Sequence, residues 1–136
     1  TLVLQDLLGS DSIELIVSGG VLRKQSMALI GPVAHGFFSL LTADTLFLGA
    51  TGYSLEKGVS CSNFIEAETK KRMMGSGAKV CLLVDSSKAG IASLAHVCDW
   101  DDIDILITDS ITDDDRSELE RLGVEVMAKN RGTGVQ

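Results

Sequence analysis

The chain has 136 residues, of which 45% are hydrophobic and only 4% aromatic, and its formal net charge is −7. This length suits one domain with an aliphatic core. The acidic balance argues against direct contact with nucleic acid, because phosphate backbones attract basic surfaces. It leaves small anionic ligands open, because a pocket needs only local positive charge. The sequence shows neither a signal peptide nor an apolar run of membrane-spanning length, so we predict a cytoplasmic protein with no membrane partner.

The first third of the chain predicts a helix, a strand and a second helix. Residues 1–8 follow a helix-like apolar pattern. The run I-E-L-I-V-S at residues 13–18 predicts a strand that ends at the pair Gly19-Gly20. Residues 32–41 predict a helix, because Pro32 is well placed in its first turn.

The middle of the chain predicts a short strand, a long connection and a well-capped helix. Residues 45–48 form the strand, which closes on Gly49 and Gly52, and residues 53–62 predict a long functional loop or an irregular crossover. The next helix covers residues 64–74.

Side-chain pairs along residues 63–74 support that helix. Asn63 suits its N-cap and Glu66 follows three residues later, as in a capping box. Glu66 with Lys70, and Glu68 with Arg72, have the i,i+4 spacing of favourable ion pairs.

The last third predicts three strands and one helix. The strands cover residues 79–84, 104–108 and 124–128. The helix begins near Thr112, since the carboxylates of residues 113–115 suit its positive end, and Gly123 stops it. We expect a domain over residues 1–130 and a flexible tail over residues 131–136. Because strands separated by helices pair in parallel, the predicted fold class is α/β, a Rossmann-like parallel sheet flanked by helices.

Glycine-containing turns follow three of the predicted strands and suggest a binding site. They comprise Gly19-Gly20, residues 49–52 and the stretch D-S-S-K-A-G at residues 85–90. Parallel strands bring such turns to one sheet edge, where ligands of α/β folds bind, and glycines let backbone N–H groups approach an anion. Lys88, at the end of a buried strand, and Arg23 would supply the positive charge. The alternative is that the glycines only make turns and that Lys88 is a solvated loop residue.

Metal and catalytic motifs are not legible in the sequence. The two histidines, His35 and His96, lack zinc-ligand spacing, and the three cysteines contain no C-x-x-C pair. No G-x-S-x-G, Walker A or G-x-G-x-x-G motif occurs. We therefore predict no metal, no cofactor and no catalytic residue.

Six stretches of the sequence, taken together, resemble a known protein family. They are V-S-G-G-V-L-R at residues 17–23, A-D-T-L-F-L-G-A-T-G at 43–52, E-K-G-V-S at 56–60, E-A-E-T-K-K-R-M-M at 66–74, L-L-V-D-S-S-K-A-G at 82–90 and I-D-I-L-I-T-D at 103–109. In this order and spacing they resemble the C-terminal effector-sensing domain of the DeoR family of bacterial transcriptional regulators, from Thr1 to about Ala128.

The resemblance implies a fold shared with ribose-5-phosphate isomerases and coenzyme A transferases, and a phosphorylated sugar or polyol as effector. It implies that DNA is bound only by a helix-turn-helix domain upstream of Thr1, followed there by a Thr/Ser-rich phosphate loop, so that this chain is a piece truncated at its N-terminus. A regulator that reads a symmetric operator is also expected to be a homo-oligomer. The ligand-binding residues that it implies are Gly19, Gly20, Arg23, Gly49, Gly52 and Lys88, with Glu66 and Lys70 as weaker candidates. Tyr53, Ser60 and Cys61 are candidates for setting which sugar binds.

Two other functions remain open from the sequence. One is an active sugar-phosphate isomerase, and the other is an oligomerisation module with a vestigial pocket. The isomerase relatives carry Asp-Gly-Ala-Asp where this chain has L-G-A-T at residues 48–51, and neither Leu48 nor Thr51 can act as a general base. The site is therefore predicted to hold a ligand without converting it.

Overall fold

The structure is a computed structural model that describes residues 2–77 and 79–129. Its α-helices are α1 (Leu2–Leu7), α2 (Pro32–Phe38), α3 (Phe64–Met74) and α4 (Asp113–Arg121), and its short 3-10 helices are η1 (Ser86–Lys88) and η2 (Trp100–Asp102). Its strands are β1 (Val21–Arg23), β2 (Ala28–Ile30), β3 (Thr45–Leu48), β4 (Gly52–Ser54), β5 (Gly58–Cys61), β6 (Lys79–Leu83), β7 (Ala95–Cys98), β8 (Ile105–Thr108) and β9 (Glu125–Ala128). The predicted α/β class is confirmed. The predicted tail at residues 131–136 lies outside the described residues.

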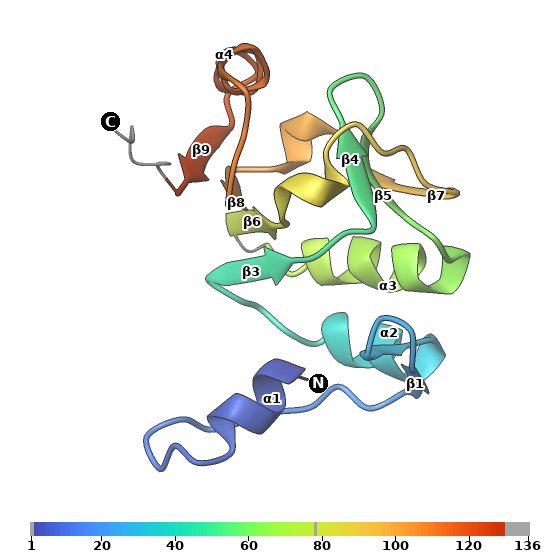
Figure 1. Ribbon diagram of the computed structural model, residues 1–136. Helices are drawn as coiled ribbons and strands as arrows, with labels where there is room; N and C mark the ends of the chain where they lie inside the picture. The colour runs from blue at the N-terminus through green and yellow to red at the C-terminus, as the bar shows by residue number, and fades with distance from the viewer. Residues whose placement is uncertain (1, 78, 130–136) are drawn as a thin grey trace.

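A parallel sheet of four strands, in the order β3-β6-β8-β9, forms the centre of the molecule (Figure 1). The strands predicted over residues 45–48, 79–84, 104–108 and 124–128 are the strands of this sheet. The register places Leu48, Leu82, Leu106 and Val126 side by side across it. These four side chains are buried, so this face of the sheet packs against the hydrophobic core.

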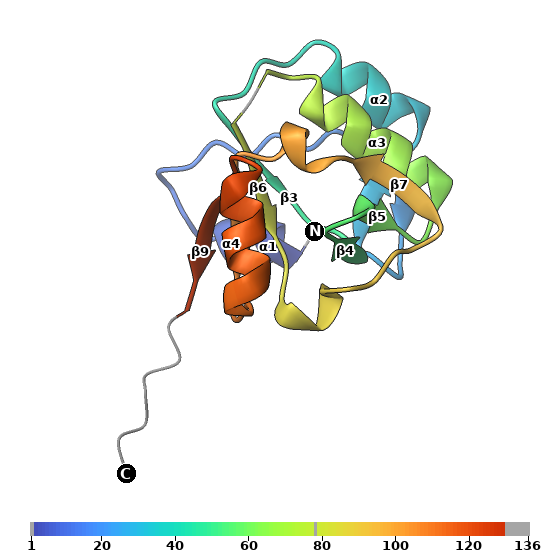
Figure 2. The same cartoon turned by 90° about the horizontal axis from the view of Figure 1, so that it is seen from above.

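A second sheet of three antiparallel strands, in the order β4-β5-β7, lies beside the first and was not predicted (Figures 1 and 2). The prediction of a loop or crossover over residues 53–62 is wrong, because this segment folds back as the β4–β5 hairpin. Gly58 has a φ of +65°, and a Cβ atom there would lie 2.3 Å from the carbonyl oxygen of Cys98. The glycine therefore both permits the turn and lets β7 pack closely.

The strand predicted over residues 13–18 is also wrong. These residues carry no strand, since the described part of the chain supplies them with no ladder partner. A strand needs backbone hydrogen bonds from a neighbour, and an apolar pattern alone does not provide them. Ile16 is 69% exposed and Val17 is 50% exposed. The chain instead forms a small hairpin from β1 and β2, just after Gly19-Gly20.

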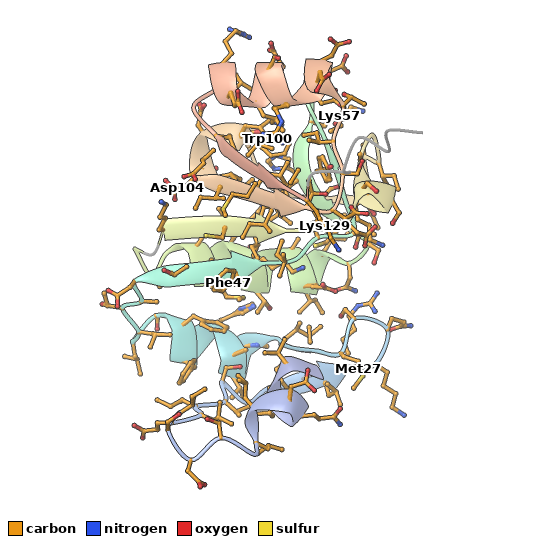
Figure 3. All side chains as sticks on the ribbon, turned by 60° about the vertical axis from the view of Figure 1, so that its left-hand side comes forward. Met27, Phe47, Lys57, Trp100, Asp104 and Lys129 are labelled. Atoms are coloured by element: carbon orange, nitrogen blue, oxygen red, sulfur yellow. The ribbon has the colours of Figure 1, made fainter. Side chains whose placement is uncertain are left out.

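The predicted helices are confirmed, and their ends follow the expected capping. The side chain of Asn63 accepts a hydrogen bond from the Glu66 N–H at 3.0 Å, and that of Thr112 accepts one from the Asp115 N–H at 3.1 Å. α2 ends at Phe38, three residues earlier than predicted. α2 and α3 pack side by side (Figure 2), whereas α1 and α4 lie at opposite ends of the molecule (Figure 3). Within the described residues, no helix has the length and apolarity to cross a membrane.

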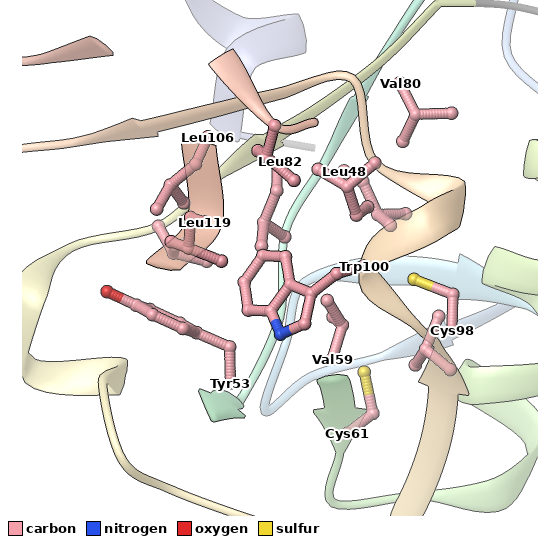
Figure 4. Packing of buried hydrophobic residues seen from close by; sticks show 14 of the residues in the cluster. Leu48, Tyr53, Val59, Cys61, Val80, Leu82, Cys98, Trp100, Leu106 and Leu119 are labelled. Carbon is pink, nitrogen blue, oxygen red and sulfur yellow. The ribbon is translucent and has the colours of Figure 1, made fainter. Parts of the chain in front are cut away.

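The hydrophobic core fills the space between the two sheets and α4 (Figure 4). Trp100 lies at its centre, with its ring edge-on to Tyr53 at a centroid distance of 5.9 Å and its indole N–H donating to the carbonyl of Ser54 at 3.0 Å. Leu119 of α4 closes the core and is fully buried. The core thus ties the parallel sheet, the antiparallel sheet and α4 into one unit.

Two neighbouring leucines of β6 test which face of the parallel sheet carries the core. Leu82 is 0% exposed, whereas Leu83 is 53% exposed on the other face. We expect Leu82→Ala to lower the free energy of unfolding by about 2–5 kcal/mol, because it leaves a cavity. Leu83→Ala, the matched control, should cost less than about 1 kcal/mol. Urea denaturation measures both, and equal losses would contradict the assigned register.

The three free cysteines, Cys61, Cys81 and Cys98, are buried. Burial, followed by the nearby carboxylates of Asp102 and Asp99, raises the pKa of the Cys98 thiol to about 12. An unfolded thiol has a pKa of about 8.5, so the stability that Cys98 contributes is complete below that pH and is lost as the pH rises toward 12.

We therefore expect native protein at pH 8 to leave all three thiols unreacted with iodoacetamide, while urea exposes them. The free energy of unfolding should fall between pH 9 and pH 11, and Cys98→Ala should make that fall smaller. Rapid labelling of the native protein, detected by mass spectrometry, would show that the thiols are accessible and contradict the packing.

Candidate functional site

A groove lies at the carboxyl edge of the parallel sheet, where the turns after β3, β6 and β8 meet. It consists of two adjoining hollows of about 400 and 430 Å³ that share Gly49, Ala50 and Lys88. The first, here the arginine hollow, is lined in addition by Arg23, Gln25, Ser26, Thr51, Ser62, Glu66 and Lys70. The second, the aspartate hollow, is lined in addition by Leu83, Val84, Asp85, Ile107, Thr108 and Asp109. We call the two together the edge groove.

The buried carboxylate of Glu66 organises the arginine hollow. Glu66 lies on the first turn of α3 and is only 4% exposed. Its two oxygens pair with different cations: Oε1 with Lys70 Nζ at 3.1 Å and Oε2 with Arg23 Nε at 3.4 Å. Lys70 Nζ also donates to the carbonyl oxygen of Gly49 at 2.6 Å. One carboxylate therefore joins the β1–β2 hairpin, α3 and the end of β3.

The Arg23 side chain retains unused donor capacity at this site. Its exposed fraction is 17%, and its Nε is buried without a hydrogen bond of good geometry, although Glu66 balances its charge. Its terminal nitrogens contact Gln25 and, at 3.5 Å, the hydroxyl of Ser62. A guanidinium has five N–H donors, so an anion in the hollow has donors to bind.

Two aspartates hold the turn that carries Lys88. Asp109, which follows β8, accepts the Ser86 N–H at 2.6 Å and the Ser86 hydroxyl at 3.2 Å. Asp85 accepts the Ser87 N–H at 2.9 Å and also the Ser87 hydroxyl. These hydrogen bonds lower the pKa of both carboxyl groups, from Ser87 for Asp85 and chiefly from the Ser86 N–H for Asp109. Both carboxylates stay ionised at neutral pH and fix η1 against β8.

Lys88 differs from the other two cations of the groove. Arg23 and Lys70 are engaged with Glu66, whereas the Lys88 ammonium has no hydrogen bond or ion pair with any residue that the structure describes. It lies where the two hollows join, beside Gly49 and Ala50. Lys88 is thus the cation that a bound anion could neutralise without breaking an existing contact.

Five of the eight residues expected at the site come together in the edge groove: Arg23, Gly49, Glu66, Lys70 and Lys88. The other three lie elsewhere. Gly20 packs inside the β1–β2 region, where a Cβ atom would lie 2.6 Å from the carbonyl oxygen of Ile30, and Gly19 is its neighbour. Gly52 packs against Ile91, whose carbonyl oxygen would lie 2.5 Å from an added Cβ. Gly20 and Gly52 allow close packing, Gly19 has a φ of +72°, and neither hollow includes any of the three.

The sequence interpretation missed Thr108 and Asp109 as groove residues, and it included Asp85 only as part of the turn at residues 85–90. The signal was present, because Asp85 follows β6 directly and Asp109 follows β8. Parallel pairing of those two strands brings their ends together. The sequence alone did not reveal that Asp109 accepts hydrogen bonds from Ser86 and so holds the turn after β6.

The two histidines serve local structure instead of a shared site. Thr69 Oγ1 donates to the carbonyl of Ile65 and accepts the Gly31 N–H, so His35 Nε2, at 2.8 Å from it, is the donor. His96 contacts the carboxylate of Asp99 at 3.0 Å. Among the residues described, no group of three or more His, Cys, Asp or Glu side chains is arranged to hold a metal ion.

Comparison with known proteins identifies the family of the chain. The model of the DeoR C-terminal sensor domain matches residues 1–110, so the chain belongs to the DeoR family. It is similar to the HTH-type transcriptional regulator GlpR of Haloferax volcanii, with 38% identity over 121 residues that make up 88% of this chain and 48% of the relative. It is also similar to the regulator GolR of Listeria innocua (30% identity, 77% of this chain, 41% of the relative) and to the L-fucose operon activator of Haemophilus influenzae (27%, 76% and 41%). The chain spans less than half the length of these relatives.

The two glutamates of α3 test whether the Glu66 network holds the groove together. Removing one partner of a buried ion pair leaves its cations unbalanced, so Glu66→Ala should lower the free energy of unfolding by about 1–3 kcal/mol. Glu68 pairs with Arg72 at 3.0 Å with the same spacing, but the two side chains are 44% and 60% exposed. Glu68→Ala, the control, should cost less than about 1 kcal/mol. Chemical denaturation measures both, and equal effects would contradict the organising role of Glu66.

Proposed function

We propose that the edge groove of this DeoR-family sensor domain binds a phosphorylated sugar or polyol, and that this ligand is the effector of a transcriptional regulator. The observation that carries the proposal is the unpaired ammonium of Lys88, held at the junction of the two hollows and beside the open backbone of Gly49. Lys88 and Arg23 would bind the phosphate through charge-assisted hydrogen bonds. The hydroxyl and carboxylate oxygens of the aspartate hollow would accept hydrogen bonds from the sugar hydroxyl groups.

We further propose that the groove binds its ligand without converting it. Isomerisation of an aldose needs a general base whose pKa lies near the working pH. The carboxylates of the aspartate hollow, Asp85 and Asp109, have lowered pKa values and accept hydrogen bonds from the η1 turn, so they are weak bases. Both oxygens of Glu66, in the arginine hollow, are engaged with Lys70 and Arg23. Leu48 is fully buried and Thr51 is a neutral hydroxyl. These features favour a sensor over the isomerase alternative.

In the whole protein, we propose that the ligand alters DNA binding by a helix-turn-helix domain and that the regulator is a homo-oligomer. The matched relatives are named as HTH-type or operon regulators, which supports the proposed role in DNA binding. A ligand can only shift an equilibrium between two forms if it binds them unequally, and such couplings are typically about 1–3 kcal/mol. The β1–β2 hairpin is one element that a ligand could move, because Arg23 links it to Glu66.

A thermal-shift panel of phosphorylated sugars and polyols, each paired with its unphosphorylated form, tests the ligand class. A ligand at 100 times its dissociation constant adds about 2.7 kcal/mol, which raises Tm by roughly 5–10 °C in a domain of this size. We expect a shift with at least one phosphorylated compound and none with its unphosphorylated partner.

Lys88→Ala should abolish that shift while leaving Tm without ligand nearly unchanged, because the Lys88 side chain makes no stabilising pair with the described residues. Lys57→Ala removes an exposed lysine at the β4–β5 turn that lines neither hollow, and it should retain the full shift (Figure 3). If no compound raises the Tm of the wild-type chain, the alternative of an oligomerisation module with a vestigial pocket is favoured. If Lys88→Ala binds the ligand normally, the groove assignment is wrong.

A further inference from the structure

The edge groove has opposite charges at its two ends. Arg23 and Lys70 lie in the arginine hollow, and Asp85 and Asp109 lie in the aspartate hollow. Lys88 borders both. The carboxylate of Glu66 balances one of the two cations in the arginine hollow, so a ligand that fills the groove meets net positive charge at one end and two carboxylates at the other.

From this polarity we infer that the effector carries one phosphate and a neutral, hydroxylated remainder, and that Asp85 and Asp109 reject ligands with a second phosphate at the far end. The inference rests on the proposed function and narrows its ligand class. Sugar bisphosphates are the class of ligand that we expect to bind more weakly.

The two carboxylates cannot easily turn away from such a ligand. Asp109 is anchored through both oxygens to Ser86, at 2.6 and 3.2 Å, and Asp85 is anchored to the backbone and side chain of Ser87. Moving either one would break hydrogen bonds that hold η1, and η1 carries Lys88. The negative charge is therefore a fixed part of the aspartate hollow.

Hydrogen-bond chemistry favours hydroxyl groups at the same place. An ionised carboxylate only accepts hydrogen bonds, so a sugar hydroxyl can donate to it. A phosphate dianion has no proton to donate and brings like charge instead. Like charges placed together across a binding site strongly disfavour the wrong partner.

Because both aspartates are exposed at the groove edge, their effect must act through a partly aqueous medium. The repulsion should then amount to about tenfold in affinity at low ionic strength, and salt should screen it. A steric exclusion of the second phosphate would not depend on salt in this way. This difference separates the electrostatic explanation from a purely geometric one.

The test is isothermal titration of the 136-residue chain with three matched pairs of sugars. They are glucose 6-phosphate with glucose 1,6-bisphosphate, fructose 6-phosphate with fructose 1,6-bisphosphate, and ribulose 5-phosphate with ribulose 1,5-bisphosphate. For each pair in which the monophosphate binds, we expect the bisphosphate to bind about tenfold more weakly at 20 mM salt. The difference should shrink to about threefold or less at 500 mM salt.

Two variants assign the effect to the carboxylates. Asp85→Asn keeps an oxygen that can accept from Ser87, and Asp85→Asn with Asp109→Asn removes both charges while leaving amide oxygens as acceptors. We expect bisphosphate to gain affinity relative to monophosphate in the first and to gain more in the second. Asp101→Asn removes an exposed carboxylate of η2 that lines neither hollow, and it should leave the ratio unchanged.

The outcomes distinguish this inference from the proposed function. If the wild-type chain binds neither member of any pair, the proposed function fails and this inference fails with it. If a monophosphate and its bisphosphate bind equally, the function stands and the inference is wrong. A preference that neither salt nor the asparagine variants reduce would also overturn it, because the cause would then be shape and not charge.

Discussion

The edge groove depends on one buried carboxylate. Burying a charge without a partner is very costly, and Glu66 is buried among cations that come from two different segments of the chain. Arg23 brings the β1–β2 hairpin, and Lys70 brings the end of β3 through its bond to Gly49. This ion pair helps to hold the hairpin over the sheet edge, together with the hydrogen bond from the Gly31 N–H, just after β2, to Thr69 of α3 at 3.3 Å. The shape of the arginine hollow therefore depends on Glu66 as much as its charge does.

The parallel sheet supplies the other half of the site. Parallel strands all end at one edge, so polar residues just after them converge without long loops. Asp85 and Lys88 follow β6, and Asp109 follows β8, its immediate neighbour. The hydrogen bonds from Ser86 to Asp109 then turn this proximity into a fixed geometry. Glu66 thus stabilises the arginine hollow, and Asp109 stabilises the aspartate hollow.

The strands of the parallel sheet were predictable because each carries a short apolar run between polar residues. Burial on both faces is not the reason, since Phe47 and Met127, on the face opposite the core, are 61% and 50% exposed. The helix at residues 64–74 was predictable because its cap and ion pairs are local. Residues 13–18 carry the same apolar signal, but pairing depends on a neighbour that periodicity does not reveal. The prediction for residues 53–62 was wrong because these strands give a weak signal in the sequence. β4 and β5 are short and rich in small residues, and they are specified by the close contact of Gly58 with β7.

At the site, the sequence predicted residue types better than contacts. It placed Lys88 and Gly49 at one edge, because that follows from the order of strands. It assigned Glu66 mainly to helix capping and predicted its i,i+4 pair with Lys70, which the structure contains. It did not predict the contact of the carboxylate with Arg23, which lies more than forty residues away along the chain. An ion pair between a hairpin and a distant helix leaves no characteristic spacing in the sequence from which it could be predicted. The glycines at positions 19, 20 and 52 were predicted to bind the ligand. Glycine suits ligand-binding turns and close backbone packing equally well, and only the surroundings of each glycine in the folded chain distinguish these two roles.

A shared fold does not transfer chemistry, and this groove gives a physical reason. Carboxylates near a sugar can abstract protons only when they are free and sufficiently basic. Here Asp109 and Asp85 accept hydrogen bonds from the N–H and hydroxyl groups of Ser86 and Ser87, respectively, which lowers their pKa and fixes them in place. The same bonds position Lys88. Freeing either carboxylate for catalysis would therefore loosen the turn that carries Lys88, the cation that we propose binds the ligand, so in this arrangement ligand binding and turnover would oppose each other.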